Sequence, residues 1–509
     1  MHELLTTKEM AEADRLAVLR GTPSIELMEH AGRAVADAVS ASFGTVRPVV
    51  VFAGPGNNGG DGFVAARLLS ERGYTVDLRL LGDISKLRGD AATEAKRYSG
   101  SVGPMTAEIP AVAIVIDALF GAGLARDIDG EAAAAITAIN NSGAHVVAVD
   151  LPSGINGDTG AVQGTAIRAT ETVTFFRKKP GHVLLPGRIH CGRTTVADIG
   201  IPASVLRDIR PRLALNQPSR WAHLFPVPRV EGHKYSRGHT LVVSGGLSST
   251  GAARLSARGA LRAGAGLVTI ASPRDALAVN SATNLAVMVR EAEGAEGLLS
   301  LLSDRRINTI ILGPGGGIGP QMRAKVVAAI SQDRTMILDA DALTSFGEKP
   351  NELFTALKNH PKSTAILTPH EGEFSRIFSR MEKISSVKQK LEATRTASHE
   401  TGSVILLKGA DSIIFSPDER GMISENAPPY LATAGAGDVL AGIIAGLCAQ
   451  GMPAFEATAA GVWLHGEAAR EAGPGLIAED LPEALRPVYR RLYAELGGGF
   501  QLGHLEPRQ

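Results

Sequence analysis

Two segments rich in small residues have the composition of a site for phosphate chemistry. Lys408-Gly-Ala-Asp-Ser412 comes first, and Thr433-Ala-Gly-Ala-Gly-Asp-Val439 directly precedes an apolar stretch that predicts a helix. Glycine lets the backbone approach a ligand closely, and the free N–H groups and positive dipole end of a helix attract anions such as phosphate. Asp438 would lie beside that anion, placed to take a proton from a hydroxyl. The pattern therefore predicts phosphoryl transfer.

A second glycine-rich segment, Gly54-Pro-Gly-Asn-Asn-Gly-Gly-Asp-Gly62, lies far upstream. It follows a predicted strand and precedes a predicted helix, so it would lie at the carboxyl edge of a sheet, where open α/β sheets bind ligands. Asn57, Asn58 and Asp61 add oxygens that suit an ion, a ribose or a phosphate. The segment has neither the dinucleotide fingerprint nor the Walker A lysine. The alternative is a tight turn held by local Asn and Asp hydrogen bonds.

Two further acids follow predicted strands in the same half of the chain. Asp117 begins Asp-Ala-Leu-Phe-Gly-Ala-Gly123, and Asp150 begins Asp-Leu-Pro-Ser-Gly-Ile-Asn-Gly157. A single aspartate at such a place is most often a helix cap. Three strand ends with acids or amides beside glycines favour one shared crevice instead.

The elements that would position these residues alternate between β-branched runs and helical periodicity, which predicts βαβ units and parallel sheets. The fold class is therefore α/β. A proline-rich, turn-rich stretch from Ile201 to about Glu231 indicates a linker, with a boundary near 212–225. The elements predicted around it are strands Pro48–Ala53, Thr75–Leu81, Ala113–Leu119, Val146–Leu151, His239–Ser244, Leu267–Ala271, Asn308–Leu312, Thr335–Leu338, Ala365–Thr368 and Val404–Leu407, and helices Ser24–Phe43, Phe63–Arg72, Gly251–Ala263, Pro320–Ile330, Ser385–Glu400 and Gly437–Ala449.

Bulk properties exclude several classes of protein. The 509 residues exceed one ordinary core, and 52 basic residues balance 52 acidic ones, so nothing favours nucleic acid or an anionic membrane. The two cysteines, Cys191 and Cys448, form neither a zinc motif nor a disulfide framework. The first residues carry acids where a signal peptide would be basic and apolar. We expect a cytoplasmic protein.

The motifs GPGNNGGDG, DALFGAG and DLPSGINGDTG resemble the NAD(P)HX epimerase family, the YjeF N-terminal type, over residues 1–213. The resemblance implies a Rossmann-like three-layer domain, Asp150 as the acid/base residue, and a potassium ion on Asn58, Asp117 and Ser153. Lys179 also matches a family position, although a solvated loop lysine is the alternative. Leu151 and Ala122 depart mildly from the family pattern. The residues implied to line the hydrated dinucleotide are Asn57, Asn58, Gly59, Gly60, Asp61, Gly121, Ala122, Gly123, Leu124, Ala125, Arg126, Asp127 and Asp150.

The second half is similar to the ADP/ATP-dependent NAD(P)HX dehydratases, which have a ribokinase-like α/β fold, over residues 223–495. The motifs that carry the resemblance are His233-Lys234, Leu241–Gly246, Gly264–Gly266, Gly313–Gly317, Asp339–Leu343, Thr368–Glu373, Lys408–Ser412 and Thr433–Asp438. The implied dinucleotide contacts are Ala252, Gly315, His370 and Asp438. The implied adenine-nucleotide contacts are Lys408, Gly409, Ala410, Asp411, Ser412 and Gly437. Ser412 replaces a common threonine and keeps its hydroxyl. His370 could be a core histidine, but its proline and glycine neighbours favour a loop at a strand end.

The resemblance implies a bifunctional repair enzyme that epimerises R and S NAD(P)HX and dehydrates the S form. Asp438 as base would activate the 6-hydroxyl toward the terminal phosphate of ADP or ATP, with Mg²⁺ to neutralise charge. The alternatives are a ribokinase-like kinase for a vitamin precursor and a non-catalytic nucleotide sensor. We expect self-association. The sequence leaves open ADP against ATP, NADH against NADPH hydrates, and direct transfer of substrate between the sites.

Overall fold

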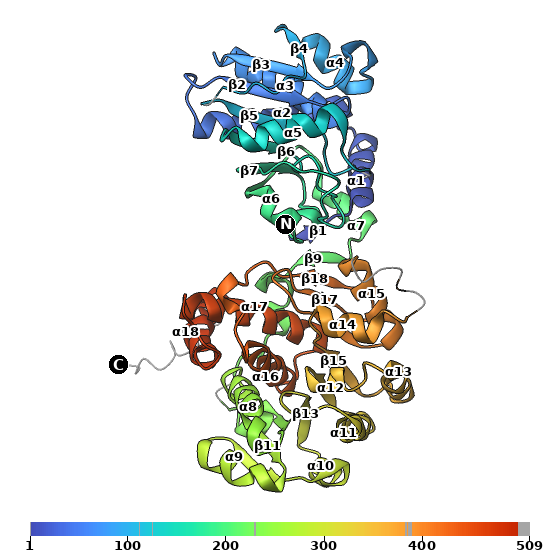
Figure 1. Cartoon of the computed structure of the whole chain (residues 1–509), viewed down its shortest axis with the longest axis vertical. Coiled ribbons are helices and arrows are strands. Elements are labelled where there is room, and N and C mark those ends of the chain that lie inside the picture. The colour runs from blue at the N-terminus through green and yellow to red at the C-terminus, as the bar shows by residue number, and fades with distance from the viewer. Residues whose placement is uncertain are drawn as a thin grey trace, which may run out of the picture. The chain divides into compact units, whose positions relative to one another are not determined.

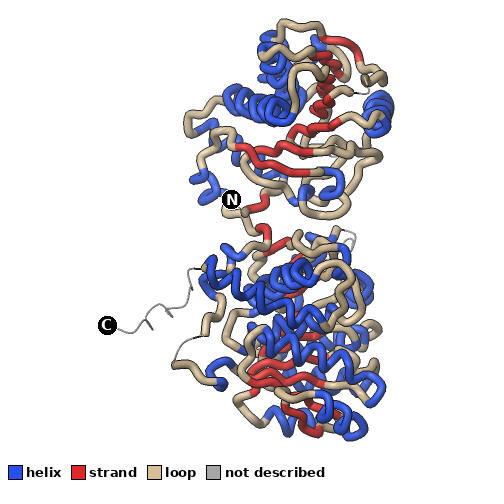
Figure 2. Tube along the Cα trace, turned by 90° about the vertical axis from the view of Figure 1, so that its left-hand side faces the viewer, coloured by secondary structure: helices blue, strands red, loops and turns tan. Residues whose placement is uncertain are grey.

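The computed structural model describes residues 2–110, 112–124, 126–228, 231–381, 384 and 389–496. The chain separates into two compact units, Met1–Ala214 and Leu215–Gln509. The domain limits given above, residues 213 and 223, stay predictions. In each unit helices lie on both sides of the strands (Figures 1 and 2), and the predicted α/β fold class is confirmed.

The first unit has a parallel sheet in the order β4-β3-β2-β5-β6-β7-β8. Its strands are β2 (Val49–Ala53), β3 (Val76–Leu80), β4 (Val102–Pro104), β5 (Ile114–Ala118), β6 (His145–Val149), β7 (Glu171–Phe175) and β8 (Arg193–Ala197), and β1 (Glu3–Leu4) pairs separately with Leu213 and Ala214. Its helices are α1 (Thr7–Leu19), α2 (Ser24–Ser42), α3 (Asn57–Glu71), α4 (Gly89–Arg97), α5 (Gly130–Asn141), α6 (Gly187–Cys191) and α7 (Leu206–Ile209).

The residues of β2 explain why this sheet is covered on both faces. All of its side chains are buried and apolar, and alternate ones point to opposite faces of the sheet. Val49 and Val51 belong to the core cluster that contains α2 and α3, whereas Val50 and Phe52 belong to the cluster that contains α5. A strand that is apolar on both faces therefore produces three layers.

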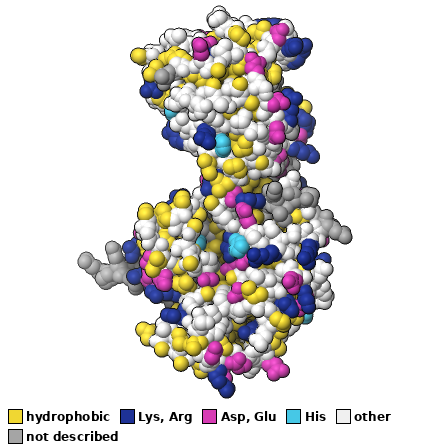
Figure 3. All heavy atoms as spheres, in the orientation of Figure 1, with side chains coloured by type: hydrophobic (Ala, Val, Ile, Leu, Met, Phe, Trp, Pro, Cys, Tyr) yellow, Lys and Arg dark blue, Asp and Glu magenta, His cyan; other side chains and the backbone are white. Residues whose placement is uncertain are grey.

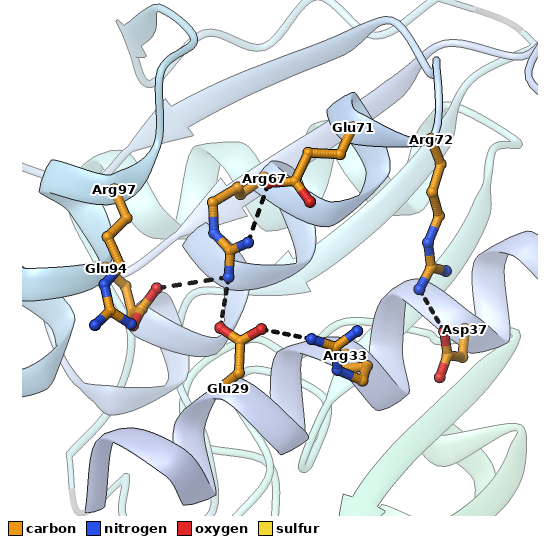
Figure 4. Close-up of polar contacts among 8 residues, drawn as sticks. All are labelled: Glu29, Arg33, Asp37, Arg67, Glu71, Arg72, Glu94 and Arg97. Atoms are coloured by element: carbon orange, nitrogen blue, oxygen red, sulfur yellow. Dashed lines mark hydrogen bonds and ion pairs between the residues drawn. The ribbon is translucent and has the colours of Figure 1, made fainter.

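An ion-pair network links α2, α3 and α4 around Arg67 (Figure 4). The Arg67 guanidinium lies 2.5 Å from Glu29 of α2 and 4.0 Å from Glu94 of α4. Glu94 is fully buried and also pairs with Arg97 at 2.6 Å, while Arg33 pairs with Glu29 at 2.8 Å. Since α3 begins at the glycine-rich segment, this network holds the helix that carries Asn57, Asn58 and Asp61.

The second unit has a sheet in the order β9-β18-β17-β16-β15-β14-β13-β10-β11-β12. Strands β10 to β16 are parallel to their neighbours, whereas β16-β17-β18 are antiparallel. The strands are β9 (Leu213–Leu215), β10 (His239–Val243), β11 (Leu267–Ser272), β12 (Met288–Glu291), β13 (Ile307–Leu312), β14 (Thr335–Leu338), β15 (Thr364–Leu367), β16 (Val404–Leu407), β17 (Ile413–Phe415) and β18 (Gly421–Ile423). The helices are α8 (Thr250–Arg262), α9 (Leu277–Thr283), α10 (Gly294–Leu302), α11 (Pro320–Ile330), α12 (Asp341–Thr344), α13 (Pro350–Asn359), α14 (Glu371–Phe378), α15 (Lys390–Thr401), α16 (Ala436–Ala449), α17 (Ala454–Ala472) and α18 (Asp480–Glu495).

Helix α16 is the centre of the second core. It is apolar around nearly its whole circumference, which is typical of a buried helix. A β-carbon added at Gly442 would lie 2.2 Å from the Ser256 carbonyl oxygen, so α8 and α16 cross in close contact because that position has no side chain. The packing fixes the start of α16, where Asp438 lies.

The strands predicted in both halves all exist, and their ends agree with the prediction to within two residues. Helix α3 begins at Asn57 rather than Phe63, because the glycine-rich segment itself forms its first turn. The start of the helix predicted over Ser385–Glu400 lies outside the described residues, and α15 begins at Lys390. Among the described residues no helix has the length and apolarity needed to cross a bilayer. On the face shown in Figure 3, acidic and basic side chains are interspersed.

Candidate active sites in the two units

The three strand ends singled out in the first half meet at one edge of the sheet. Strands β2, β5 and β6 are direct neighbours, and the glycine-rich segment, Asp117 and Asp150 lie at or just after their carboxyl ends. A cavity of about 800 Å³ opens there. Of the residues predicted to line the dinucleotide, the cavity is lined by Asn57, Asn58, Asp61, Gly121, Ala122, Gly123, Leu124, Arg126 and Asp150.

The remaining predicted residues of this set lie elsewhere. Gly59 and Gly60 are buried within the first turn of α3, where Gly60 lies against Met28 and Ala91. Asp127 does not line the cavity. Ala125 lies outside the described residues. Gly59 and Gly60 therefore allow close packing around the start of α3 and do not line the cavity.

Asp150 is held in an unusual backbone conformation with φ 63°. Its Oδ1 accepts hydrogen bonds from Lys179 Nζ at 2.5 Å and from Thr174 Oγ1 at 3.0 Å, and its Oδ2 accepts one from the Ala122 N–H at 3.3 Å. Burial alone would raise the pKa of Asp150, but the charge of Lys179 and the hydrogen bonds from Lys179 and Thr174 bring the pKa below its usual value. The carboxylate therefore stays charged and can accept a proton.

Lys179 lies inside the site, so the solvated-loop alternative is wrong. Its side chain is 2% exposed, and Nζ also donates to Thr174 Oγ1 at 3.0 Å. His182 supports it: the Lys179 N–H donates to Nδ1 at 3.0 Å, and Nε2 lies 2.8 Å from the Asp150 carbonyl oxygen. Burial, with the charge of Lys179, lowers the pKa of His182 to about 4. The imidazole is neutral, with Nε2 protonated, and it ties the lysine and the aspartate together.

Two more carboxyls share this cavity. Asp61, the fifth residue of α3, is buried, and burial together with the charges of Asp150 and Asp14 raises its pKa well above its usual value. Asp14, on α1, also lines the cavity, and burial raises its pKa to about 6, against the opposing charge of Lys179. Sequence reasoning missed Asp14, because an aspartate in the middle of an amphipathic helix is typical of a solvated face.

Of the residues predicted to hold potassium, Asn58 lines the cavity, whereas Asp117 and Ser153 do not. Asp117 and Ser153 are fully buried, with Ser153 Oγ donating to Asp117 Oδ1 at 2.6 Å and the Ser153 N–H donating to Oδ2 at 2.8 Å. Burial raises the pKa of Asp117 to about 6, although these hydrogen bonds oppose the shift. Asn58 Nδ2 is buried without a hydrogen-bond partner, and a β-carbon at Gly121 would lie 3.0 Å from Asn58 Oδ1.

In the second unit, Asp438 lies in the first turn of α16. Gly435 directly precedes the helix with φ 86°, a left-handed conformation that glycine adopts without strain. Burial raises the pKa of Asp438 to about 6, with Asp339 adding to the shift and Lys408 opposing it. Ser256 Oγ of α8 donates to the Asp438 carbonyl oxygen at 2.8 Å and anchors this turn. Asp438 therefore lies at the N-terminal end of the helix, as predicted.

Lys408, at the end of β16, is the cation of this second site. Its Nζ donates to Asp339 Oδ1 at 2.5 Å, and a β-carbon at Gly437 would lie 3.6 Å from Nζ and 3.9 Å from Asp339 Oδ2. Burial raises the pKa of Glu373, with Asp339 adding to that rise and Lys408 opposing it. Several carboxylates therefore surround one amine at the carboxyl edge of the sheet, opposite the start of α16.

The segment Lys408–Ser412 forms a tight turn in front of this lysine. Ser412 Oγ donates to the Gly409 carbonyl oxygen at 2.7 Å and accepts from the Gly409 N–H at 3.1 Å, so the hydroxyl shapes the turn. Asp411 is buried, and Lys390 Nζ lies 3.7 Å from its Oδ1. Gly409 and Ala410 are exposed at the tip.

The residues predicted to contact the dinucleotide in this unit come from different elements: Ala252 lies in α8, Gly315 in the loop after β13, His370 just before α14 and Asp438 in α16. Gly315 has φ 61°, and a β-carbon there would lie 3.3 Å from the Ala252 β-carbon, so these two positions are adjacent. His370 is exposed before α14, where its Nδ1 accepts a hydrogen bond from the Gly372 N–H at 3.0 Å. The prediction of a loop at a strand end is thereby confirmed, and the core alternative is wrong.

Among the described residues no group of three or more His, Cys, Asp and Glu side chains converges as a metal site. The oxygens of Asn58, Asp117 and Ser153 are nevertheless hard ligands that suit potassium, and the hydrogen bonds that Asp117 accepts come from neutral groups. The carboxylates around Lys408 suit Mg²⁺ in the same way. The donor sets therefore fit both predicted ions.

Comparison with known proteins matches both units. The family described as YjeF-related protein N-terminus matches residues 24–181, and the family described as NAD(P)H-hydrate dehydratase matches residues 240–485. A bifunctional NAD(P)H-hydrate repair enzyme Nnr from Moorella thermoacetica is 37% identical, with 97% of this chain and 98% of the relative covered. A protein of the same name from Coxiella burnetii is 34% identical, with 96% and 99% covered.

Among solved structures, an ADP/ATP-dependent NAD(P)H-hydrate dehydratase from Bacillus subtilis, co-crystallised with ATP/Mg²⁺, is similar to part of this chain. It is 26% identical, with a TM-score of 0.46, and covers 55% of this chain and 98% of its own. The yeast protein YNL200c is 24% identical, with a TM-score of 0.35, and covers 41% of this chain and 93% of its own.

Proposed function

The chain belongs to the family of bifunctional NAD(P)H-hydrate repair enzymes, and from this premise we propose how its two sites divide the work. The enzyme interconverts the R and S forms of hydrated NADH and NADPH and dehydrates the S form at the expense of ADP or ATP. The observation that supports the assignment of sites is the position of Asp150 just after β6 in the first unit and of Asp438 in the first turn of α16 in the second.

Epimerisation is proposed at the cavity of the first unit. The C6 hydroxyl of the hydrated ring must leave and return, or the ring must open, and either route needs a group that exchanges protons. Asp150 suits this role because Lys179 keeps its carboxylate charged and Thr174 and Ala122 hold it in place. Arg126, which also lines the cavity, offers a cation to the diphosphate or the ribose phosphates.

A potassium ion is proposed on Asn58, Asp117 and Ser153. When bound, it would supply positive charge next to the substrate oxygens. Asp117 would hold the ion by its charge, Ser153 by its hydroxyl oxygen and Asn58 by its side-chain oxygen. The described hydrogen bonds of Asp117 all come from neutral groups, so no basic side chain among them neutralises its charge. The fully buried Asp117 carboxylate is the reason that a cation would bind there, since an isolated buried charge is costly.

Dehydration is proposed at the start of α16. Asp438 would remove the proton from the 6-hydroxyl of the substrate, while the oxygen of that hydroxyl attacks the terminal phosphate of the nucleotide. The N–H groups of the first turn of α16 would stabilise the phosphate charge. Lys408 to Ser412 and Gly437 would bind the adenine nucleotide, while Ala252, Gly315 and His370 would contact the dinucleotide. Mg²⁺ would neutralise phosphate charge, with Asp339 and Glu373 near enough to Lys408 to take part.

The product distinguishes this function from a small-molecule kinase. A dehydratase releases inorganic phosphate and restores the dihydronicotinamide, because phosphate is a better leaving group than hydroxide, whereas a kinase releases a stable phosphate ester. We therefore expect equal molar amounts of phosphate and NADH from purified S hydrate, measured with ADP and with ATP in separate reactions. A persistent phosphorylated dinucleotide without NADH would contradict the assignment.

Two properties of the whole chain complete the proposal. We propose that it acts in the cytoplasm and that it self-associates. Sedimentation analysis of the purified chain and fractionation of its source cells would test them. A monomer over a wide concentration range would contradict self-association without affecting the assignment of either site.

A further inference from the structure

Helix α1 brings a third carboxyl to the cavity of the first unit. Residues on one side of α1, spaced three or four apart as a helix face requires, line the cavity together with the sheet edge: Thr7, Met10, Ala11, Asp14 and Val18. Asp150 and Lys179 reach the same cavity from the ends of β6 and β7. The cavity thus has a carboxyl on its helical wall and another on its sheet wall.

The helical wall is firmly attached. Thr6 and Glu9 form a capping box, with the Thr6 N–H donating to Glu9 Oε2 at 2.8 Å and the Glu9 N–H donating to Thr6 Oγ1 at 3.2 Å. The Thr7 N–H and Oγ1 donate to Asp158 at 2.7 and 2.8 Å. Asp14 is therefore presented to the cavity on a fixed helix rather than on a mobile loop.

The charged groups that face Asp14 give the carboxyls different proton affinities. Asp61 comes from α3, Asp150 from the end of β6, Lys179 from the loop after β7 and Arg126 from the loop after β5. Lys179 Nζ forms an ion pair with Asp150 Oδ1 at 2.5 Å. The pKa of Asp150 is consequently lowered, that of Asp61 is raised well above its usual value, and that of Asp14 is raised to about 6 by burial. Asp14 is thus the carboxyl whose protonation changes near neutral pH.

Epimerisation at C6 makes a specific demand on such a cavity. When the hydroxyl leaves, C6 becomes trigonal, and inversion requires water to depart from one face of the ring and to add to the other. Each face therefore needs its own proton-transfer group. One group must donate a proton while the other accepts one, and the two groups exchange roles when the reaction runs backwards.

We propose that Asp14 and Asp150 are the two proton-transfer residues of the epimerase, one on each face of the hydrated ring, an inference that rests on the proposed function of this site. The Asp14 carboxyl donates its proton to the C6 oxygen as the C–O bond breaks, and the N1 lone pair forms the N1–C6 double bond of a cationic imine. Water then adds to the opposite face of C6 and loses its proton to Asp150, while the N1–C6 π electrons return to N1. One water leaves and one adds, so no oxidant or reductant is needed.

The test uses the full chain with Asp438→Asn, so that dehydration does not remove the S form. Exchange between purified R and S NADHX is followed by chromatography, with buffer alone subtracted. We compare Asp14→Asn, Asp150→Asn and, as a matched control on α1, Glu12→Gln. Glu12 pairs with Arg15 at 2.7 Å on the exposed face of the helix. Coincident denaturant unfolding curves for Asp14→Asn and the wild-type chain show that the first unit is folded, because dehydration in the second unit does not report on it.

We expect Asp14→Asn to lower the kcat of epimerisation by about 100-fold or more, with a small change in KM, and Glu12→Gln to leave both unchanged. In the wild-type enzyme, Asp14 must be protonated while Asp150 is charged. The rate of epimerisation should therefore fall as the pH rises above about 6, where Asp14 loses its proton. Asp14→Asn should lose that decline. A kcat within about 3-fold of wild type, or an unchanged pH profile, would overturn the inference while leaving Asp150 in place. No exchange above buffer by the wild-type site would instead overturn the proposed epimerase function, and this inference with it.

Discussion

At the scale of single residues, the two proposed catalytic aspartates have opposite surroundings. Asp150 forms an ion pair with the buried Lys179, and the pKa of Asp150 lies below its usual value. Asp438 has no such partner among its described contacts, since Lys408 donates to Asp339 instead, and burial raises the pKa of Asp438 to about 6. A base with a pKa just below the working pH is well matched to removing a proton from a hydroxyl.

We predict that Asp438→Asn abolishes dehydration while the nucleotide still binds, because the amide cannot accept the hydroxyl proton. The loss in kcat should be about 100- to 10,000-fold, the usual contribution of a general base. Titration of ADP and ATP by calorimetry should give dissociation constants close to those of the wild type. Full activity of the variant would exclude the role.

The pH dependence of dehydration follows from the same carboxyl. As a base, Asp438 is active when deprotonated, so kcat/KM for S hydrate should rise with pH through about 6 and then level off. The rate is measured with nucleotide and Mg²⁺ saturating at every pH. A rate that falls through this range would show that the essential group acts as an acid.

A third prediction concerns potassium. We expect replacement of NaCl by KCl at equal ionic strength to raise the melting temperature of the wild-type chain and the rate of epimerisation, because K⁺ would compensate the buried charge of Asp117. Asp117→Asn should lose both effects. Equal responses to K⁺ and Na⁺ in the wild-type chain would contradict the proposed ion site, and the dehydration rate serves as the internal control.

At the scale of elements, the Arg67 network in Figure 4 should stabilise the helices that frame the first site. We predict that Arg67→Ala lowers the free energy of unfolding by about 3 kcal/mol, because it removes the cation between Glu29 and the buried Glu94. Arg33→Ala is the matched control in the same network: Arg33 is 48% exposed, and its loss should cost at most about 0.5 kcal/mol. Denaturant unfolding measures both. Equal effects would show that the buried position of Glu94 is unimportant.

Elements with a strong local sequence pattern could be predicted from the sequence, whereas elements that depend on packing between distant segments could not. Strands such as Thr335–Leu338 and Val404–Leu407 are continuous apolar runs between turn residues, and they were predicted to the residue. The predicted start of helix α3 is six residues too late. The run of Asn and Gly from Asn57 to Gly62 has low helix propensity, and packing against α2 and α4 makes it helical. Short strands such as β12 (Met288–Glu291), whose side chains are largely exposed, gave no periodic signal.

The same reasoning explains which site residues could be predicted. Asp117, Asp150 and Asp438 carry local signals, because each follows a strand or precedes a helix beside glycines. The position of Asp14 in the cavity and the pairing of Lys179 with Asp150 result from contacts between segments more than 25 residues apart. No local sequence pattern predicts such contacts. The Lys179–Asp150 bond spans 29 positions in the sequence. The coordinates were therefore needed to place both of them.

At the scale of the whole molecule, two reactions on one substrate are carried out by separate units. We predict that the sites can complement each other between molecules, because the S hydrate released by one chain can diffuse to another. Asp150→Asn alone should restore NADH only from the S share of a mixed hydrate, beyond slow spontaneous exchange. Adding Asp438→Asn chains, which restore nothing alone, should bring recovery close to completion. A mixture no better than Asp150→Asn alone would require direct transfer within one chain.

The most direct test of the account is recovery of the dihydronicotinamide absorbance from an R and S mixture of hydrated NADH, with ADP, ATP or no nucleotide, in the presence of Mg²⁺ and K⁺. The account predicts complete recovery with at least one nucleotide, none without nucleotide, and recovery limited to the S share in Asp150→Asn. No recovery under any condition, with nucleotide consumed only when another small alcohol is supplied, would contradict it and identify a kinase.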